Sequence, residues 1–366
     1  MSSQEEQLGK LRQQIDQIDQ QILELVSKRA VCAAEVAEVK QQNPGSDAVF
    51  YRPEREAQVL RSIMAKNPGP LGDEEVARVF RQIMSSCLAL EQPMQIAFLG
   101  PEGTFTQAAA LKHFGHSVIS KPLHSIDEVF REVESRSAHY GVVPIENSTE
   151  GMVHHTLDMF RNSPLKICGE VELRVHQHLL AADGVDLENL TRIYSHQQSL
   201  AQCRRWLDAR YPNVERVAVS SNAEAARRAA DEKADNVAAI AGDMAAELYQ
   251  LNCVVDSIED QPDNTTRFLV IGNQLVGPSG KDKTSMLISA RNKPGTLYHL
   301  LEPFHRQGIS LTRIETRPSG MGTWGYIFYI DCEGHYGDAP LQRVMKEVAD
   351  EAMELKLLGS YPQAVL

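Results

Sequence analysis

Polar side chains follow a short apolar run near the middle of the chain. Residues 140–143 lead directly into Pro144-Ile145-Glu146-Asn147-Ser148, which offers a carboxylate, an amide and a hydroxyl. Helix-like sequence resumes at Met152. In open α/β sheets, ligands bind beyond the carboxyl ends of strands, where helix N-termini offer free N–H groups to anions. The sequence therefore predicts a site for a small anionic ligand at this loop.

A second group of candidate residues belongs to a predicted helix near the N-terminus. Apolar residues recur at the period of one helix face, at Leu8, Leu11, Ile15, Ile18, Ile22 and Leu25. The same count next reaches Arg29. Burying an unpaired guanidinium is costly, so an anion must lie near Arg29. That anion is either the carboxylate of Glu24 or Glu35, or a ligand.

Two further helices are predicted to bring more charge to the same region. Pro53 suits the first turn of the second helix, and the third spans about residues 73–91 with Cys87 and Glu91 on one face. The first helix, unbroken from Lys10 to Asn43, would be about 50 Å long. That length is too great for a monomeric domain of this size, so we expect pairing with a second chain. The helices are expected to direct six charged side chains to one region: Arg12, Arg29, Lys40, Arg55, Glu56 and Glu91.

Residues 5–92 resemble the all-helical chorismate mutases through Leu11-Arg12, Lys28-Arg29, Lys40 and Arg52-Pro53-Glu54-Arg55-Glu56. The resemblance implies an intertwined dimer with a cationic pocket for chorismate, whose pericyclic rearrangement needs neither nucleophile nor metal. It implies that Lys40 acts on the ether oxygen as a catalytic residue and that Glu56 binds the substrate hydroxyl. It also implies that Arg12, Arg29 and Arg55 hold carboxylates. The remaining expected chorismate contacts are Cys87 and Arg52, which stands where an Asp is common.

Glu91 departs from the pattern of this family. It stands where a Gln often donates a hydrogen bond to the ether oxygen. An ionised carboxylate cannot donate. We therefore hypothesise that Glu91 is catalytic in its protonated form, so that mutase turnover falls as the pH rises.

The middle of the chain alternates predicted strands with polar loops and helices. The strand at 95–99 precedes the loop at 100–106, and the strand at 192–194 precedes Ser195-His196-Gln197-Gln198. This alternation predicts α/β architecture with largely parallel sheets. A crossover near residues 171–182 indicates two lobes with a ligand cleft between them. The strand at 265–271 is expected to return to the first lobe.

Some motifs in this segment have simpler interpretations. Adjacent histidines on a helix diverge, so His154 and His155 are favoured as surface or supporting residues over metal ligands. Ser195 and His196 could be a nucleophile and its base, but adjacency seldom gives triad geometry. The loop at Gly100 lacks both the dinucleotide and the P-loop patterns. We therefore expect neither a metal nor a cofactor.

Residues 94–275 resemble prephenate dehydratases through Gly100-Pro101-Glu102-Gly103-Thr104-Phe105-Thr106, Pro144 to Ser148, Ser195 to Gln198, and Thr266-Arg267-Phe268. The resemblance implies two lobes like those of periplasmic binding proteins. Prephenate between them would lose water and CO2 to give phenylpyruvate, with Thr266 as the catalytic hydroxyl. We assign Glu146 as a candidate proton source. Arg267 either binds substrate or forms an ion pair that holds its strand to a helix. The expected prephenate contacts are Thr104, Asn147, Ser148, Ser195, Gln202 and Arg267.

The last segment is predicted to be a small α+β unit. Residues 276–283 have the composition of a linker, and the strands and helices after it follow the ferredoxin-like order βαββαβ. Gly295-Thr296-Leu297 and Glu315-Thr316-Arg317-Pro318 resemble the two marks of ACT regulatory domains. The resemblance implies phenylalanine bound between paired domains, with Gly295, Thr296, Leu297, Glu315 and Thr316 as its contacts. Glu315 could instead be a charge at a strand end.

Length and composition limit the remaining possibilities. A chain of 366 residues exceeds one ordinary core, and we place domains at 1–92, 94–275 and 284–366. The formal charge of −12 argues against a nucleic-acid partner. Six scattered cysteines indicate reduced thiols. No apolar run approaches a membrane span, and the polar start fits neither a signal nor a transit peptide, so a cytoplasmic protein is expected.

The order of the three segments resembles bifunctional chorismate mutase–prephenate dehydratases, which serve phenylalanine synthesis. This resemblance implies a homodimer or a dimer of dimers that is inhibited by phenylalanine. A non-catalytic binding protein that responds to amino acids is the alternative, and the charges of the first segment and the intact Thr266-Arg267-Phe268 disfavour it. A mutase joined to a dehydrogenase is disfavoured because the dinucleotide fingerprint is missing.

Overall fold

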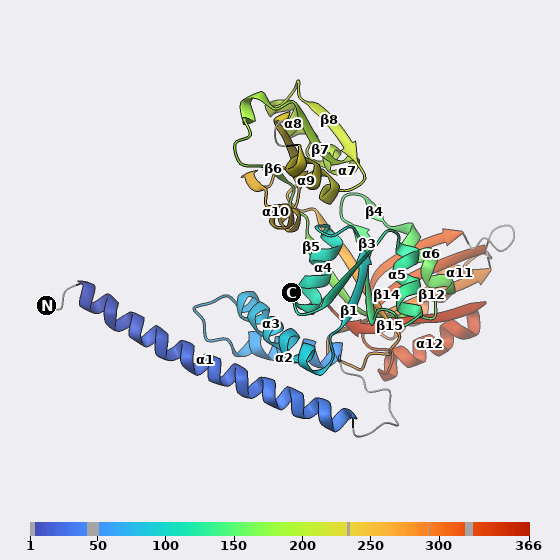
Figure 1. Cartoon of the computed structure of the whole chain (residues 1–366). Coiled ribbons are helices and arrows are strands. Elements are labelled where there is room, and N and C mark those ends of the chain that lie inside the picture. The colour runs from blue at the N-terminus through green and yellow to red at the C-terminus, as the bar shows by residue number, and fades with distance from the viewer. Residues whose placement is uncertain (1–3, 42–50, 233–234, 292, 319–324) are drawn as a thin grey trace.

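The computed structural model describes residues 4–41, 51–232, 235–291, 293–318 and 325–366 of the chain (Figure 1). From its composition, the sequence predicts a turn-rich break at residues 43–49 and a turn at residues 320–322, and both lie outside these ranges. The described chain forms a helical unit, a two-lobed α/β unit and a small α+β unit in sequence order. None of the helices in these ranges is both long enough and apolar enough to cross a bilayer.

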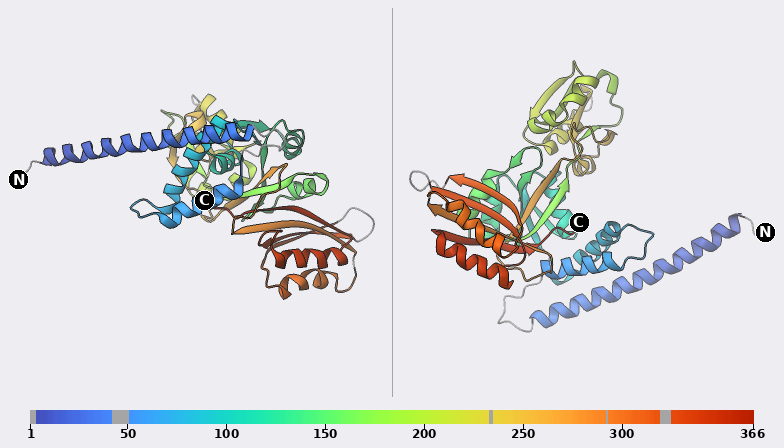
Figure 2. Two further views of the ribbon diagram at one scale, coloured as in Figure 1. Left: turned by 90° about the horizontal axis from the view of Figure 1, so that it is seen from below. Right: turned by 180° about the vertical axis from the view of Figure 1, so that it is seen from behind.

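The helical unit consists of α1 (Gln4–Gln41), α2 (Pro53–Lys66) and α3 (Asp73–Glu91). Proline opens α2 at a position where its missing N–H costs nothing, and acidic residues fill the first turn of α3, where they complement the helix dipole. The N-terminal half of α1 projects away from the other elements (Figures 1 and 2). The predicted apolar face of α1 is therefore solvent-exposed in one chain, at 45% to 64% for Leu8, Leu11, Ile15, Ile18, Ile22 and Leu25.

The first lobe of the α/β unit contains a six-stranded sheet of order β2-β1-β3-β11-β5, with β4 paired to β3. Its strands are β1 (Gln95–Leu99), β2 (Ile119–Leu123), β3 (Tyr140–Asn147), β4 (Gly151–Met152), β5 (Lys166–Arg174) and β11 (Thr265–Gly272). Its helices are α4 (Phe105–Phe114), α5 (Ile126–Glu134) and α6 (His154–Asn162).

The second lobe contains a five-stranded sheet of order β10-β6-β9-β7-β8. Its strands are β6 (His178–Ala181), β7 (Arg192–His196), β8 (Glu215–Val219), β9 (Val237–Ala241) and β10 (Asn252–Val255). Its helices are η1 (Leu187–Asn189), α7 (Gln197–Gln202), α8 (Arg204–Arg210), α9 (Asn222–Asp231) and α10 (Asp243–Tyr249).

The connections between the lobes confirm the predicted crossover near residues 171–182 and the predicted return of the strand at 265–271. The chain crosses from β5 in the first sheet to β6 in the second, and it returns late through β11, which lies between β3 and β5. The prediction of largely parallel sheets is wrong. Among the described strands of the two lobes, only the pairs β1–β2, β1–β3, β7–β8 and β7–β9 are parallel, because each returning or crossing strand enters its sheet antiparallel.

The α+β unit has the predicted βαββαβ order. It consists of β12 (Asp282–Arg291), α11 (Thr296–Arg306), β13 (Leu311–Pro318), β14 (Gly325–Glu333), α12 (Ala339–Glu351) and β15 (Glu354–Pro362), in an antiparallel sheet β13-β14-β12-β15. Both helices cover one face of this sheet through residues such as Leu300 and Val344. The other face packs on the first lobe, where Leu287 and Tyr329 share a core with Phe160 and Ile167.

Candidate functional site

A cleft of about 250 Å³ lies between the two lobes and is lined by polar residues from both. They stand at the carboxyl ends of strands, as the sequence predicted: Gly100 and Thr104 after β1, Asn147 at the end of β3, His196 and Gln198 after β7, Ser220 and Ser221 after β8. The ten-residue helices α4 and α9 begin at this cleft, with Thr104 and Ser221 as their N-caps. Their first N–H groups and dipoles favour an anionic ligand.

Thr266 and Asn147 are neighbours in the wall of the cleft. Asn147 Nδ2 donates to Thr266 Oγ1 at 2.8 Å and to Asn264 Oδ1 at 2.7 Å. Asn147 Oδ1 accepts from the N–H and hydroxyl groups of Thr149 at 3.0 Å and 2.6 Å, which sets the orientation of the amide. Because Thr266 accepts from Asn147, its own hydroxyl hydrogen can point to a ligand. Within the described ranges, the structure shows no protein acceptor for that hydrogen.

Two other predicted contacts also line the cleft. Gln202, on α7 of the second lobe, accepts from Asn264 Nδ2 at 3.3 Å and from Gln177 Nε2 at 3.4 Å, so it connects the lobes. The Thr104 hydroxyl donates to the backbone carbonyls of Leu99 and Pro101, at 3.2 Å and 3.0 Å. Thr104 therefore stabilises the loop and the start of α4 as well as lining the cleft.

The structure contradicts two of the predicted roles. Neighbouring residues in a strand point to opposite faces of the sheet. Glu146 and Arg267 therefore point away from the cleft that Asn147 and Thr266 line. Glu146 forms an ion pair with Arg313 of β13, so it is not a proton source in the cleft. Arg267 forms the ion pair that the sequence allowed as an alternative, although its partners lie on strands rather than on a helix.

Two serines that were predicted to bind substrate support the cleft from outside its lining. Ser195 is fully buried and donates to the carbonyl of Ile240 at 2.9 Å. Ser148 Oγ accepts from the backbone N–H of Thr265 at 3.0 Å and so joins β3 to β11. His196 does line the cleft, but its Nδ1 accepts from the backbone N–H of Gln198 at 3.4 Å. No bond between His196 and Ser195 occurs in the described chain, so they are not a nucleophile and base.

Two asparagines outside the set of predicted contacts connect the residues of this site. Asn264 is buried and lies between Asn147 and Gln202. Asn222 lines the cleft, and its side-chain oxygen accepts from Ser195, from Ser199 and from the backbone of His196. Asn222 follows the Ser220-Ser221 loop after a strand, and Asn264 lies two residues before Thr266. Both positions could have been singled out as amides beside a recognised motif.

The helical unit brings only part of its predicted site together in one chain. Lys40 Nζ lies 3.4 Å from Glu91 Oε2, and Cys87 is buried one turn before Glu91. Arg12 and Arg29 are exposed on α1, and Arg55 is exposed on α2. Arg12 is 28 residues before Lys40 in one continuous helix, a separation of about 42 Å at 1.5 Å per residue. Arg12 and Lys40 of the same chain therefore cannot line one pocket, which is consistent with the expected pairing with a second chain.

The remaining charged residues of this unit pair elsewhere. Arg52 Nε lies 2.8 Å from Glu54 Oε1. Glu56 Oε1 lies 3.2 Å from Arg81 Nε, and burial raises the pKa of Glu56 although Arg81 opposes the shift. Arg81 is ten residues before Glu91 on α3, about 15 Å along the helix. The structure therefore separates Glu56 from the Lys40–Glu91 pair, in contrast to the prediction.

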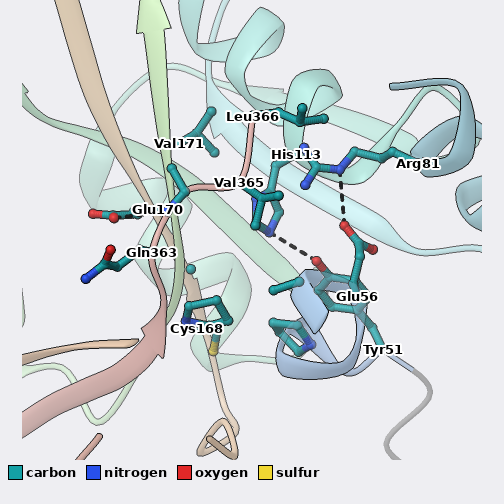
Figure 3. A pocket seen from close by; sticks show the side chains of 15 residues that line it. Tyr51, Glu56, Arg81, His113, Cys168, Glu170, Val171, Gln363, Val365 and Leu366 are labelled. Atoms are coloured by element: carbon teal, nitrogen blue, oxygen red, sulfur yellow. Dashed lines mark hydrogen bonds and ion pairs between the residues drawn. The ribbon is translucent and has the colours of Figure 1, made fainter. Parts of the chain in front are cut away.

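Glu56 faces a small hollow where the C-terminus meets the helical unit (Figure 3). Tyr51 Oη lies 3.1 Å from His113 Nε2 of α4, and burial together with the charge of Arg81 lowers the pKa of His113 to about 3. The backbone N–H of Ala364 donates to Glu170 at 3.1 Å. Arg61 of α2 donates to Ser279 Oγ and to the carbonyls of Lys281 and Gln363, at 3.0 to 3.1 Å. The hydrogen bonds of Arg61 connect α2 to the segment before β12 and to the segment after β15 of the α+β unit.

The α+β unit contains a pocket of about 360 Å³ beside the start of α11. Gly295, Thr296, Leu297 and Thr316 line it with the aromatic rings of Tyr298, Tyr326 and Phe328. Gly295 has φ +83°, a conformation that favours glycine and that turns the chain into α11. Glu315 is not among the lining residues, because it points to the opposite face of β13 from Thr316. The prediction of a contact from Glu315 is therefore not supported.

Within the described residues, the donor atoms of His178, Cys253 and Asp256 lie within 4.8 Å of one another. His178 Nδ1 already accepts from the backbone N–H of Ser257 at 3.1 Å, and the other two side chains are exposed. His155 pairs with Asp127 at 2.6 Å on the surface. All six cysteines are free thiols, and four of them are buried.

Three family models match successive parts of the chain: chorismate mutase type II at residues 11–92, prephenate dehydratase at 96–275, and ACT domain at 284–350. A protein of Stutzerimonas stutzeri described as bifunctional chorismate mutase/prephenate dehydratase is 62% identical over 366 residues, which is 100% of both chains. The solved structure of prephenate dehydratase in complex with L-Phe from Arthrobacter aurescens is 34% identical with a TM-score of 0.68, and covers 73% of this chain and 89% of that one. A structure described as a novel type of quorum-quenching acylase is 27% identical with a TM-score of 0.69, and covers 74% and 98%.

Proposed function

The chain belongs to the bifunctional chorismate mutase/prephenate dehydratase family, and we propose that it catalyses both reactions for phenylalanine synthesis. Residues 1–92 would convert chorismate to prephenate, residues 94–275 would convert prephenate to phenylpyruvate, and residues 284–366 would bind phenylalanine. The observation that carries the proposal is the Asn147–Thr266 pair in a cleft onto which two helix N-termini open.

In the dehydratase reaction, prephenate loses its ring hydroxyl as water and its ring carboxylate as CO2. The electron pair of the breaking C–C bond completes the aromatic ring, which supplies the driving force. Thr266 donates a hydrogen bond to the departing oxygen, and Asn147 keeps the hydroxyl oriented for that task. The N-termini of α4 and α9 hold the remaining carboxylate. His196 is the only titratable side chain among the described lining residues, so it replaces Glu146 as the candidate proton source.

In the mutase reaction, two copies of the chain would complete each pocket. One copy supplies Lys40, Cys87 and Glu91, which already lie together. The second copy supplies Arg12, because the length of α1 keeps Arg12 from reaching Lys40 within one chain. The exposed apolar face of α1 supports this pairing, since a contiguous apolar surface of this kind marks an interaction site. Pairing would bury the face and place cations around the dicarboxylate substrate.

We predict that the mutase loses activity as the pH rises, through Glu91. Only the protonated carboxyl can donate to the ether oxygen, so this role competes with the ion pair that the ionised carboxylate forms with Lys40. The Glu91→Gln variant keeps a donor at every pH, so its turnover should be almost flat. Mutase kcat measured across pH 5 to 9 in both proteins checks this expectation. Glu38→Gln, at an exposed position on α1, is the matched control and should follow the wild-type slope. An unchanged slope in Glu91→Gln would remove Glu91 from this role.

The α+β unit would bind phenylalanine in its 360 Å³ pocket. The rings of Tyr298, Tyr326 and Phe328 match an aromatic side chain, and the start of the eleven-residue α11 matches a carboxylate. The complex of the Arthrobacter aurescens prephenate dehydratase with L-Phe supports this assignment. Bound phenylalanine would then inhibit the pathway that makes it.

An acyl-transfer reaction is the rival suggested by the quorum-quenching acylase of similar fold. Such a reaction needs a nucleophile next to a base. Among the described residues that line the cleft, the His196 ring accepts a hydrogen bond from the backbone of Gln198 and forms none with a hydroxyl group. We therefore favour the dehydratase, which needs a hydrogen-bond donor and no nucleophile.

One assay tests the proposed function. The full-length chain is given chorismate, and in a second series prephenate, with no added cofactor, and phenylpyruvate is followed by its absorbance. We expect product from both substrates, and less product when phenylalanine is added. If phenylpyruvate forms from prephenate but not from chorismate, the chain has only the dehydratase activity. If it forms from neither substrate, a binding protein without catalysis is favoured.

A further inference from the structure

We propose that Glu146 and Arg267 are positioning residues, through which the sheet of the α+β unit holds Asn147 and Thr266 in place. This inference rests on the proposed dehydratase role of Thr266. It assigns a role to two residues whose side chains do not line the cleft. It also explains how a separate regulatory unit can reach the catalytic pair without touching substrate.

The four residues occupy two adjacent rungs of one strand pair. Thr266 is in register with Asn147, and Arg267 is in register with Glu146. Side chains alternate along each strand, so the first rung faces the cleft and the second faces the α+β unit. Arg267 is the next residue after Thr266, so a displacement of the Arg267 backbone is passed to Thr266 through a single peptide unit. The strand pair therefore connects the contacts of the α+β unit directly to Thr266 and Asn147.

The second rung is anchored from behind by four strands, β5, β13, β14 and β15. The Arg267 guanidinium donates to Glu170 of β5 at 2.8 Å, to Asp331 of β14 at 2.7 Å and to Tyr361 of β15 at 3.0 Å. Glu146 pairs with Arg313 of β13, and Arg313 also lies 3.9 Å from Asp331. Asp331 thus contacts both Arg267 and Arg313, the partner of Glu146.

The contacts of Arg267 are buried, which makes them sensitive to small displacements, whereas the Glu146 side chain is 40% exposed. Side-chain exposure is 10% for Arg267, 11% for Asp331 and 1% for Glu170. In such surroundings charges interact strongly, and removing one partner leaves the other uncompensated. Asp331 is also fixed by Ser285, whose hydroxyl donates to it at 2.6 Å. The Arg267 side chain therefore has a defined place that depends on β14.

The strand pair is irregular at this point. The register of β11 on β3 shifts between Arg267 and Phe268, so that Phe268 pairs with Pro144 instead of Ile145. A bulge bends its strand and redirects nearby side chains, and bulges are frequent beside active sites. The regular ladder therefore does not by itself set the direction of Thr266. The contacts of Arg267 supply that constraint.

The anchors share strands with the proposed phenylalanine pocket. Thr316 lines the pocket and is three residues from Arg313 on β13, and Phe328 lines it and is three residues from Asp331 on β14. A shift of β13 or β14 when the pocket fills would move both anchors. The distance between Asn147 and Thr266 would then depend on phenylalanine.

The test uses the full-length chain with Asp331→Asn, which removes the charge and keeps the shape, and with Arg267→Lys, which loses the forked contact. We expect each to lower the dehydratase kcat by about tenfold with an unchanged KM for prephenate, since small misplacements of reacting groups are costly. Phenylalanine, whose binding is measured by calorimetry, should still bind but should inhibit the dehydratase less. Mutase kcat in the same samples reports folding and should not change.

Lys356→Gln is the matched control at the same interface. Lys356 donates to the carbonyls of Phe160, Arg161 and Ser163 at 2.7 to 3.0 Å, remote in sequence from the strand pair of Asn147 and Thr266. An equal loss of kcat in Lys356→Gln would overturn the inference, because any weakening of the interface would then suffice. Normal kcat in both Asp331→Asn and Arg267→Lys would also overturn it. If either variant fails to fold, Tyr361→Phe, which removes one hydroxyl, decides: unchanged kcat and inhibition refute the proposal. Full dehydratase activity of Thr266→Ala would instead refute the proposed function on which it rests.

Discussion

Replacing Thr266 with alanine should lower the dehydratase kcat by about 10²- to 10³-fold, the loss typical when one donor to a developing negative charge is removed. Asn147 already occupies the acceptor side of the Thr266 hydroxyl. The hydroxyl hydrogen is therefore available to the departing oxygen, and alanine has no group to replace it. The mutase activity of the same chain should remain, because its residues lie in the helical unit. Steady-state rates with prephenate and with chorismate measure both effects.

Two further variants separate the loss of the hydroxyl from other changes at this strand. Thr266→Ser keeps a hydroxyl and should recover most of the rate. Thr265→Ala removes the neighbouring hydroxyl, which donates to the carbonyl of Asp263 at 3.4 Å outside the cleft, and should leave kcat within about twofold of wild type. Substantial dehydratase activity in Thr266→Ala would refute the assignment.

Replacing Ile18 with aspartate should give a monomer with mutase activity reduced by about 100-fold or more. Ile18 is 53% exposed in one chain and lies in the middle of the apolar face of α1. A charge there would be buried without a partner if two copies pair through this face, which is strongly unfavourable. The pocket would then lose the partner's contribution of Arg12. Light scattering with gel filtration measures the mass, and chorismate consumption measures the rate. Gln20→Asp, on the opposite side of the same helix, should change neither.

Mixing two inactive variants tests the shared pocket directly. Arg12→Ala and Lys40→Ala damage different sides of each pocket if the pocket is built from two copies. After subunit exchange, half of the dimers would be mixed, and one of the two pockets in each mixed dimer would be intact. The mixture should therefore recover about a quarter of the wild-type mutase rate, as expected for a twofold interface. No recovery would show that Arg12 acts in its own chain.

The sequence by itself determined the local structure and the residue types of the sites. The three-and-four spacing of α1 and the βαββαβ order are local patterns, and the structure confirms both. The polar loop after β3 was likewise recognisable, because strand ends carry ligand groups in this architecture. Helix geometry also predicts that Arg12 and Lys40 of one chain lie far apart, since they are separated by 28 residues of unbroken helix.

Only the tertiary structure decided which face of a strand meets the cleft. Alternation separates Glu146 from Asn147 and Arg267 from Thr266, but it does not state which member of each pair faces the ligand. That choice depends on how β11 returns between β3 and β5 and on the α+β sheet that packs behind them. The pairings of β11 with β3 and β5 join residues more than ninety positions apart, and no local pattern encodes them. For the same reason, Glu315 and Thr316 could not be assigned to different faces of β13 until the position of α11 was known.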